Sequence, residues 1–310
     1  MIRSSMTKGA FNPQLTRARF LPRTTALPWN LRIIRALSAL QAKLSDSKVE
    51  VAGVDESVSV RVWRTSSASP APGLLWIHGG GMVIGTAAQD DRQCGRLARE
   101  LGVVVASVEY RLAPEFPYPV PLEDCYKALL WLAAQPDVDG SRIAIGGASA
   151  GGGLAAGVAL LDRERGEVGL VAQMLAYPMI DDRTAERADI DGRRLRMWNQ
   201  RSNRFGWASY LGARFGGDVP APAAPSRCSH LRGLPPAWIG VGTNDLFHDE
   251  DVAYATRLRE SGVPCELHVV PGAYHGFDLV EARAPISREF TEAYTDFLKD
   301  RLSVGDPDRR

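Results

Sequence analysis

The sequence predicts an α/β protein whose core is a mostly parallel sheet of about eight strands with helices on both faces. Two observations carry this prediction. Short continuous apolar runs, such as residues 74–77 and 103–106, recur along the chain and are typical of strands buried on both faces. Segments of helix length separate these runs, as the crossover connections of a parallel sheet require. The composition, with 45% hydrophobic and 24% charged residues, is that of a globular protein and excludes a disordered chain.

Residues 1–45 are expected to lie outside the sheet, as N-terminal cap helices. Large apolar residues at positions 29, 33, 34, 37, 40 and 44 have the spacing of a one-sided helix, and Pro28 suits its first turn. The same 45 residues contain eight Lys or Arg and no Asp or Glu. Transit peptides share this charge bias, but Pro22 and Arg23 interrupt any secretory signal core, so we favour a surface segment. Both Met1 and Met6 are compatible with the native start.

The rest of the chain is expected to alternate strands with helices. Residues 49–54 and 57–63 alternate apolar and polar side chains, which indicates an antiparallel pair of strands. The later strands are expected at 74–77, 103–106, 143–145, 170–175, 237–241 and 267–270. The helices between and after them are expected at 90–101, 122–134, 150–163, 249–261 and 286–302.

The strand pattern stops between Pro178 and Pro235, over 56 residues. A structureless loop of that length is unusual, so inserted helices are expected at about 179–234. Together with residues 1–45 they would cap one end of the sheet, and the main domain is expected to span 46–310. The aromatic residues of the insertion are expected mainly to pack it against this domain: Trp198, Phe205, Trp207, Tyr210 and Phe215.

Charge and residue usage argue against several classes of function. The 37 Lys or Arg and 36 Asp or Glu leave a net charge of +1, so no general attraction to nucleic acid or to acidic lipid is expected. No apolar run approaches the roughly 20 residues of a membrane helix. The four cysteines form no CxxC motif and the five histidines no HxxxH motif, so no metal site is expected. Buried, inert thiols and a cytoplasmic location are the corresponding expectations.

A strand, a GxSxG motif and a helix follow one another at residues 143–163. This sharp turn presents a serine hydroxyl at the end of the strand, and glycines on both sides of the serine avoid clashes between side chains. The helix behind the serine directs its N-terminal amides at the reacting centre. We therefore expect Ser149, flanked by Gly147 and Gly151, to be a nucleophile. A glycine-rich turn with a bystander serine is the alternative.

A second motif, HGGG at residues 78–81, directly follows an apolar run. Consecutive glycines leave backbone amides unshielded, as the stabilisation of a developing oxyanion requires. The expected donors are the amides of Gly80, Gly81 and Ala150, and His78 is expected to be structural. A phosphate-binding loop is disfavoured because no Lys or Ser/Thr follows as in a P-loop.

A serine nucleophile needs a base and an orienting carboxylate. Asp245 follows the run 237–241, and His275 lies in a glycine-bracketed loop after the run 267–270. Because the carboxyl ends of parallel strands meet at one edge of the sheet, Ser149, Asp245 and His275 are expected to converge there. Three other acids compete with Asp245, and the first two of them look like first-turn helix acids: Asp249, Glu250 and Asp278.

These motifs resemble those of the bacterial hormone-sensitive-lipase-like (family IV) carboxylesterases of the α/β-hydrolase superfamily. The resemblance rests on five segments in the family's order, at residues 78–81 (HGGG), 110–115 (YRLAPE), 147–152 (GASAGG), 245–250 (DLFHDE) and 274–277 (YHGF). It implies an eight-stranded α/β-hydrolase core with an N-terminal helical cap. It also implies Ser149, Asp245 and His275 as the catalytic triad, with no cofactor.

The sequence departs from the family pattern at a few positions near the site. Ala148 stands where Asp or Thr is usual, Met82 where an aromatic residue is frequent, and Leu246 where Pro is common. The first two departures bear on substrate preference. The residues expected to line the substrate pocket are Met82, Val83, Ala148, Trp198 and Tyr177.

The expected function is that of a serine carboxylesterase that hydrolyses short- to medium-chain acyl esters through an acyl-enzyme. A lactonase, deacetylase or amidase would use the same residues, so these remain alternatives. A non-catalytic receptor for a small ligand is a distant alternative, because receptors that resemble this family have lost a triad member. The expected partner is a small-molecule ester, with no nucleic acid. The C-terminal strand and the helix at 286–302 are compatible with a homodimer.

Overall fold

The structure, a computed structural model, describes residues 10–43, 49–64 and 70–303. Its centre is an eight-stranded sheet with the strand order β1-β2-β4-β3-β5-β6-β7-β8. The pairs β1–β2 and β2–β4 are antiparallel and the other neighbouring pairs are parallel, so the predicted fold class is confirmed. The strands are β1 Glu50–Gly53, β2 Ser59–Trp63, β3 Ala71–Ile77, β4 Val104–Glu109, β5 Val138–Ala148, β6 Ala172–Ala176, β7 Ala237–Gly242 and β8 Cys265–Val270.

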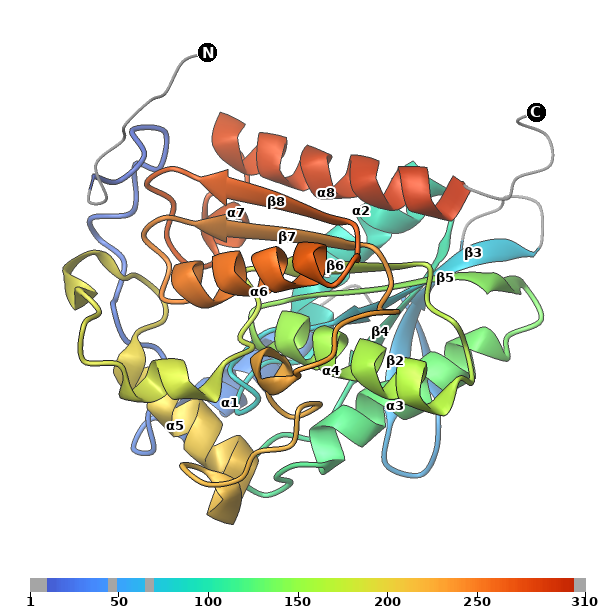
Figure 1. Cartoon of the computed structure of the whole chain (residues 1–310), viewed down its shortest axis with the longest axis horizontal. Helices are drawn as coiled ribbons and strands as arrows, with labels where there is room; N and C mark the ends of the chain where they lie inside the picture. The colour runs from blue at the N-terminus through green and yellow to red at the C-terminus, as the bar shows by residue number, and fades with distance from the viewer. Residues whose placement is uncertain (1–9, 44–48, 65–69, 304–310) are drawn as a thin grey trace.

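Helices cover both faces of this sheet (Figure 1). They are α1 Leu31–Lys43, α2 Asp91–Leu101, α3 Val120–Ala133, α4 Ala150–Arg165, α5 Gln200–Leu211, α6 His248–Glu260, α7 Phe277–Val280 and α8 Pro285–Ser303. Side chains alternate along a strand, so β3 sends Leu74 and Trp76 to one face and Leu75 and Ile77 to the other. The first pair shares a hydrophobic cluster with α2 and α8, and the second pair shares one with α3, α4 and α6.

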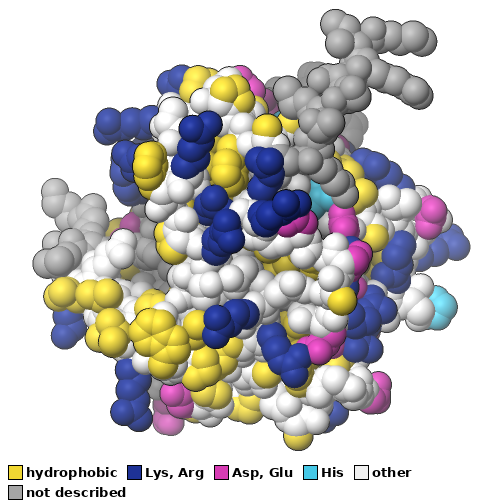
Figure 2. All heavy atoms as spheres, turned by 90° about the vertical axis from the view of Figure 1, so that its left-hand side faces the viewer, with side chains coloured by type: hydrophobic (Ala, Val, Ile, Leu, Met, Phe, Trp, Pro, Cys, Tyr) yellow, Lys and Arg dark blue, Asp and Glu magenta, His cyan; other side chains and the backbone are white. Residues whose placement is uncertain are grey.

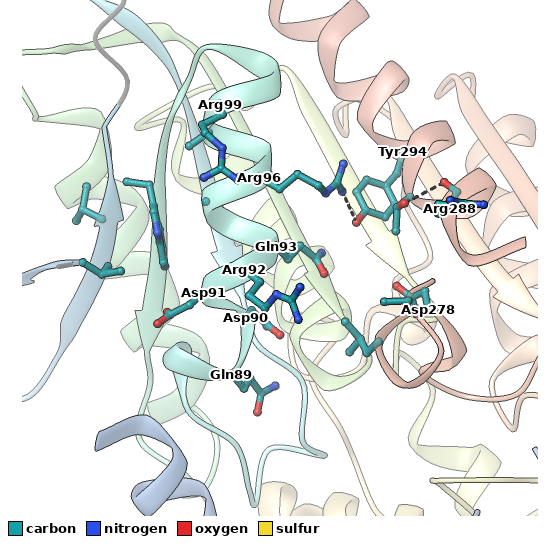
Figure 3. A pocket seen from close by; sticks show the side chains of 18 of the residues that line it. Gln89, Asp90, Asp91, Arg92, Gln93, Arg96, Arg99, Asp278, Arg288 and Tyr294 are labelled. Atoms are coloured by element: carbon teal, nitrogen blue, oxygen red, sulfur yellow. Dashed lines mark hydrogen bonds between the residues drawn. The ribbon is translucent and has the colours of Figure 1, made fainter. Parts of the chain in front are cut away.

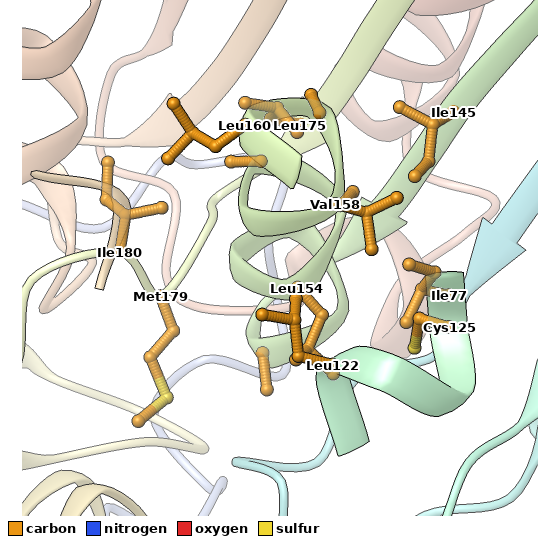
Figure 4. Close-up of a cluster of buried hydrophobic side chains, with 14 of the residues drawn as sticks. Ile77, Leu122, Cys125, Ile145, Leu154, Val158, Leu160, Leu175, Met179 and Ile180 are labelled. Atoms are coloured by element: carbon orange, nitrogen blue, oxygen red, sulfur yellow. The ribbon is translucent and has the colours of Figure 1, made fainter. Parts of the chain in front are cut away.

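Helix α4 is the central helix of the second cluster, and it contacts side chains from α3 and from the sheet (Figure 4). Its first half is rich in glycine and alanine, which lets neighbouring backbone approach closely. A Cβ on Gly153 would lie only 2.0 Å from the carbonyl oxygen of Met179. The helix that follows Ser149 is therefore held tightly against the loop after β6.

The insertion at 179–234 is less helical than the sequence suggests. It contains one α-helix, α5, and the short 3₁₀ segments η2 Asp182–Glu186, η3 Gly192–Arg194, η4 Gly212–Arg214 and η5 Pro225–Arg227. Trp207 and Tyr210 of α5 are fully buried, as expected for side chains that pack the insertion against the body. In Figure 1, α1 and α5 lie on the side toward which the arrowheads of β7 and β8 point.

The described residues bear on three further expectations, which concern membrane helices, metal sites and cysteines. No helix within residues 10–43, 49–64 and 70–303 is long and apolar enough to cross a membrane. In the same residues no group of His, Cys, Asp and Glu is arranged to hold a metal ion. All four cysteines are free thiols, and Cys265 is only partly buried, so the expectation that all four are buried is wrong at this position.

Candidate active site

Ser149 lies at the tight turn between β5 and α4. Its backbone dihedrals, φ 58° and ψ −123°, are unfavourable for a residue with a side chain. Hydrogen bonds hold this conformation in place. The amide of Ser149 donates to the carbonyl of Ala176 at 2.9 Å, and its carbonyl accepts from the amides of Gly153 and Met179, each at 3.0 Å. The serine is thus fixed at the carboxyl end of the parallel strands.

The glycines on either side of Ser149 are required by space. A Cβ on Gly147 would lie 2.5 Å from the carbonyl oxygen of Gly151. A Cβ on Gly151 would lie 2.0 Å from the carbonyl oxygen of Ile77, at the end of β3. Both distances are far below van der Waals contact, so the GxSxG pattern follows from the close approach of β3 to this turn.

His275 and Asp245 complete a hydrogen-bonded chain that starts at Ser149. Nε2 of His275 lies 2.9 Å from Oγ of Ser149, and Nδ1 lies 2.9 Å from Oδ2 of Asp245. Because Nδ1–H donates to the carboxylate, Nε2 is the nitrogen that accepts the serine hydroxyl. The second oxygen of Asp245 accepts from the amide of Phe247 at 3.0 Å. The structure thus brings together the three residues predicted from chain order, and all three are at most 7% exposed.

Aromatic rings enclose the imidazole of His275. Tyr177 and Phe247 lie edge-on to it, with ring centroids 4.9 and 5.2 Å away. Asp278, which competes with Asp245 at the level of sequence, accepts a hydrogen bond from the Tyr177 hydroxyl at 2.7 Å instead. Burial raises the pKa of Asp278 to about 6. Sequence reasoning missed this pair because Tyr177 and Asp278 are 101 residues apart and belong to no shared motif.

The predicted oxyanion donors lie on two segments beside Ser149. Gly80 and Gly81 have φ values of 127° and 61°, which favour glycine. Among the described residues, neither amide donates a hydrogen bond to a protein acceptor. Ala150 is the first residue of α4, and the first amides of a helix have no intrahelical acceptor. The three amides are therefore available to a ligand.

Backbone hydrogen bonds and a stacked pair of rings hold the glycine loop in place. The carbonyl of Gly80 accepts from the amides of Val83 and Ile84, and the carbonyl of Met82 accepts from the amide of Ala113. The ring of His78 stacks on Tyr110 with centroids 4.3 Å apart. Burial lowers the pKa of His78 to about 4, so this histidine is neutral and fits a structural role.

The residues predicted to line the substrate pocket are all buried near these segments. A Cβ on Gly81 would lie 2.2 Å from the indole of Trp198, so that ring covers the glycine loop directly. Nε1 of Trp198 donates to Asn203 of α5 at 3.3 Å, a contact that no sequence pattern indicated. Met82, Val83 and Ala148 are at most 5% exposed. The hydroxyl of Tyr177 donates a hydrogen bond to Asp278. The role of these five residues in substrate binding stays a prediction.

Asp249 and Glu250 both lie in the first turn of α6, as expected, but their contacts differ. Asp249 is exposed and forms an ion pair with Arg187 at 3.0 Å. Glu250 is buried, and its Oε1 accepts from the amides of Ile180 and Asp181 at 2.9 and 3.1 Å. Glu250 therefore ties the start of the insertion to α6, which the sequence alone did not reveal.

A groove outside this site runs between α2 and α8 (Figure 3). Asp90 and Asp278 both line it, together with arginine side chains from the two helices. Nε1 of Trp76 donates to Asp90 at 2.8 Å, and burial raises the pKa of Asp90 to about 7. Ser149 and His275 are not among the lining residues.

The chain is similar in sequence and structure to known hydrolases. Residues 74–279 match a family described as having the alpha/beta hydrolase fold. Esterase LipI of Mycobacterium tuberculosis is 32% identical over 292 residues, which cover 86% of this chain and 89% of that protein. Carboxylesterase NlhH of the same species is 35% identical over 246 residues, which cover 76% of this chain and 75% of that protein. The solved structure of a bacterial heroin esterase superimposes with a TM-score of 0.84 at 40% identity, covering 94% of this chain and 98% of that one.

Proposed function

Since the chain belongs to the α/β-hydrolase family of hormone-sensitive-lipase-like esterases, we propose that Ser149, Asp245 and His275 are its catalytic triad. The chain is a carboxylic ester hydrolase, and the relatives compared above are named as esterases. The observation that carries the assignment of residues is the unbroken chain of hydrogen bonds from Asp245 through His275 to Ser149.

The proposed reaction follows from the atoms at each end of that chain. Oγ of Ser149 attacks the ester carbonyl carbon while Nε2 of His275 accepts the hydroxyl proton. Asp245 holds the tautomer and stabilises the imidazolium that forms. The amides of Gly80, Gly81 and Ala150 bind the oxyanion, and each such donor is typically worth about 3 kcal/mol in the transition state.

When this intermediate collapses, His275 donates its proton to the alcohol oxygen and the bond between the acyl carbon and that oxygen breaks. The alcohol departs, and the acyl group remains bonded to Ser149 as an acyl-enzyme. Water then attacks the acyl carbonyl, with His275 accepting its proton, and the acid is released as Ser149 regains its proton. We propose short- to medium-chain acyl esters as substrates, in line with the family resemblance and with the indole of Trp198, which lies directly against Gly81 of the glycine loop.

The test is hydrolysis of 4-nitrophenyl esters from acetate to palmitate by the wild type and by Ser149→Ala. We expect a rate that peaks at short or medium chains and falls at least about 10⁴-fold in the variant, because the nucleophile is lost. An unfolding transition shared by the two proteins controls for folding. A variant that keeps its rate would refute the proposed nucleophile, and a peak at the longest chains would refute the proposed chain length.

Two finer points are part of the proposal. We propose a cytoplasmic location, in line with four free thiols. We also propose that the protein forms a homodimer through β8, which is an edge strand of the sheet, and the adjacent α8. Light scattering measures the mass in solution, and a monomer at all concentrations would refute the dimer.

A further inference from the structure

One side of α1 and the residues before it is apolar and points away from the protein. Trp29, Ile33, Leu37 and Leu40 are 76%, 59%, 61% and 54% exposed. Their spacing places them on one side of a helix with 3.6 residues per turn. We call these four residues the apolar stripe. Phe20, earlier in the chain, is 88% exposed.

The orientation of α1 is fixed by its opposite side. Leu31 is buried against the core. Arg35 donates from Nε to the carbonyl of Val83 at 2.8 Å and from a terminal nitrogen to the carbonyl of Ala113 at 2.6 Å. A third bond joins Arg35 to Glu115 at 2.8 Å. With these contacts in place, the apolar stripe cannot turn inward.

The N-terminal segment that carries the apolar stripe is basic, although α1 also has an exposed acid beside it, Glu115, which pairs with Arg35. Residues 1–45 contain eight Lys or Arg and no Asp or Glu, although the whole chain has a net charge of only +1. Five of these cations are exposed: Arg17, Arg19, Arg23, Arg32 and Lys43. On the face shown in Figure 2, apolar side chains gather at the lower left with basic ones near them, and most acidic side chains lie to the right, with a small acidic group below the apolar ones.

We propose that the apolar stripe and the basic residues of the same segment, among them Arg32 and Lys43 on α1 itself, are a docking surface for an anionic lipid bilayer. A helix that exposes Trp, Leu and Ile beside Arg and Lys suits the boundary between head groups and acyl chains. Attraction to anionic lipid adds to the burial of the apolar stripe. Two copies of the chain facing each other here would bring like charges together, so a second copy is disfavoured as the occupant. Nucleic acid would leave the apolar side chains in water.

Docking in this way would bring the candidate site close to the membrane. Arg35 links α1 directly to Val83, which follows the glycine loop with Gly80 and Gly81. An ester that partitions into the bilayer would then reach the site without crossing bulk water. This consequence rests on the proposed function, whereas the docking itself does not.

The test is co-sedimentation of the full chain with vesicles of phosphatidylcholine alone and of an equimolar mixture with phosphatidylglycerol. We expect binding to the anionic vesicles that weakens at high salt, because screening reduces the electrostatic part. The double variant Ile33→Gln/Leu37→Gln should bind at least about tenfold more weakly, since two side chains lose their apolar burial. The matched control is Val51→Gln/Leu279→Gln, which changes two apolar residues that are 60% and 48% exposed elsewhere.

Three results would overturn the proposal. The first is a wild type that does not bind anionic vesicles. The second is equal vesicle binding by the two double variants. The third is an Ile33→Gln/Leu37→Gln variant that is a monomer where the wild type is a dimer, with unchanged vesicle binding. A cooperative urea unfolding transition shared by every protein is the check on folding, and hydrolysis of soluble 4-nitrophenyl acetate is measured separately. A wild type that binds vesicles but hydrolyses no ester would count against the proposed function and leave the docking surface standing.

Discussion

At the scale of single residues, His275 has one hydrogen-bond partner on each ring nitrogen, and this determines which proton it can move. Asp245 accepts from Nδ1 at 2.9 Å, so Nε2 faces Ser149 as an acceptor. An amide in place of the carboxylate turns an N–H toward Nδ1 and favours the tautomer with the proton on Nε2. That tautomer cannot take the proton of the serine.

We therefore expect Asp245→Asn to lower kcat by about 10⁴-fold while the protein remains folded. Steady-state hydrolysis of 4-nitrophenyl acetate measures the effect. Asp278→Asn is the matched control, because its carboxylate is bonded to Tyr177 and not to His275. If Asp278→Asn showed the larger loss, the assignment of Asp245 as the orienting carboxylate would be wrong.

The buried carboxyl of Asp90 makes stability depend on pH. Burial raises its pKa from the ordinary 3.8 to about 7 in the folded protein. A carboxyl whose folded pKa is the higher one stabilises the fold fully below about pH 4, and this contribution is lost as pH rises through 7. Asp90→Asn removes this dependence, and its side-chain oxygen still accepts from Trp76.

Relative to Asp90→Asn, the wild type should therefore lose on the order of 2 kcal/mol of unfolding free energy between pH 5 and pH 8. Urea titrations of both proteins at the two pH values measure it. A difference between the proteins that is the same at both pH values would contradict the raised pKa.

The sequence predicts the positions of some of these residues but not the contacts of others. Ser149, Asp245 and His275 could be predicted because each follows a recognisable apolar strand and because their chain order is informative. The Tyr177–Asp278 bond and the Glu250 contacts could not, because they join segments that meet only after the sheet has formed. Glu250 also has the sequence context of an ordinary helix N-terminus, which conceals its buried role.

At the scale of elements, the turn between β5 and α4 depends on the end of β3. The carbonyl oxygen of Ile77 occupies the space that any side chain on Gly151 would need, at 2.0 Å from an added Cβ. Backbone atoms cannot move aside as a flexible side chain can. The turn and the neighbouring strand must therefore separate if this glycine is replaced.

We expect Gly151→Ala to destabilise the protein by about 3 kcal/mol or more and to abolish esterase activity, because Ser149 is displaced. Gly140→Ala is the control, since a Cβ there meets its nearest neighbour at an ordinary 3.5 Å. Urea unfolding and ester hydrolysis are measured for both. Similar stability of the two variants would mean that the turn adapts more easily than the geometry indicates.

The elements differ in how well their sequence reveals them. Strands of the parallel sheet are apolar on both faces, so short runs such as residues 74–77 identify them. The 3₁₀ segments of the insertion are three to five residues long and leave no periodic pattern, so the sequence does not reveal them. The expectation of inserted helices rests only on the length of the segment. Periodicity did identify α1, but it could not say on which side the protein lies.

At the scale of the whole molecule, Arg35 connects the N-terminal segment to the candidate site. It donates to two backbone carbonyls, of Val83 and Ala113, and forms an ion pair with Glu115, whose side chain is 57% exposed. Bonds from a charged donor to partly buried carbonyls contribute more than an ion pair in solvent does. The carbonyl bonds should therefore hold α1 to the body more strongly than the ion pair does.

Arg35→Met keeps most of the apolar stem of the side chain and removes both carbonyl bonds. We expect amide hydrogen exchange in α1 to accelerate by about tenfold or more, as local opening becomes easier. KM for 4-nitrophenyl esters should rise, because Val83 adjoins the glycine loop. Glu115→Gln removes only the exposed ion pair, so its exchange should stay close to that of the wild type. If both variants exchanged alike, the attachment of α1 would have to lie in its apolar contacts, such as Leu31, and not in Arg35.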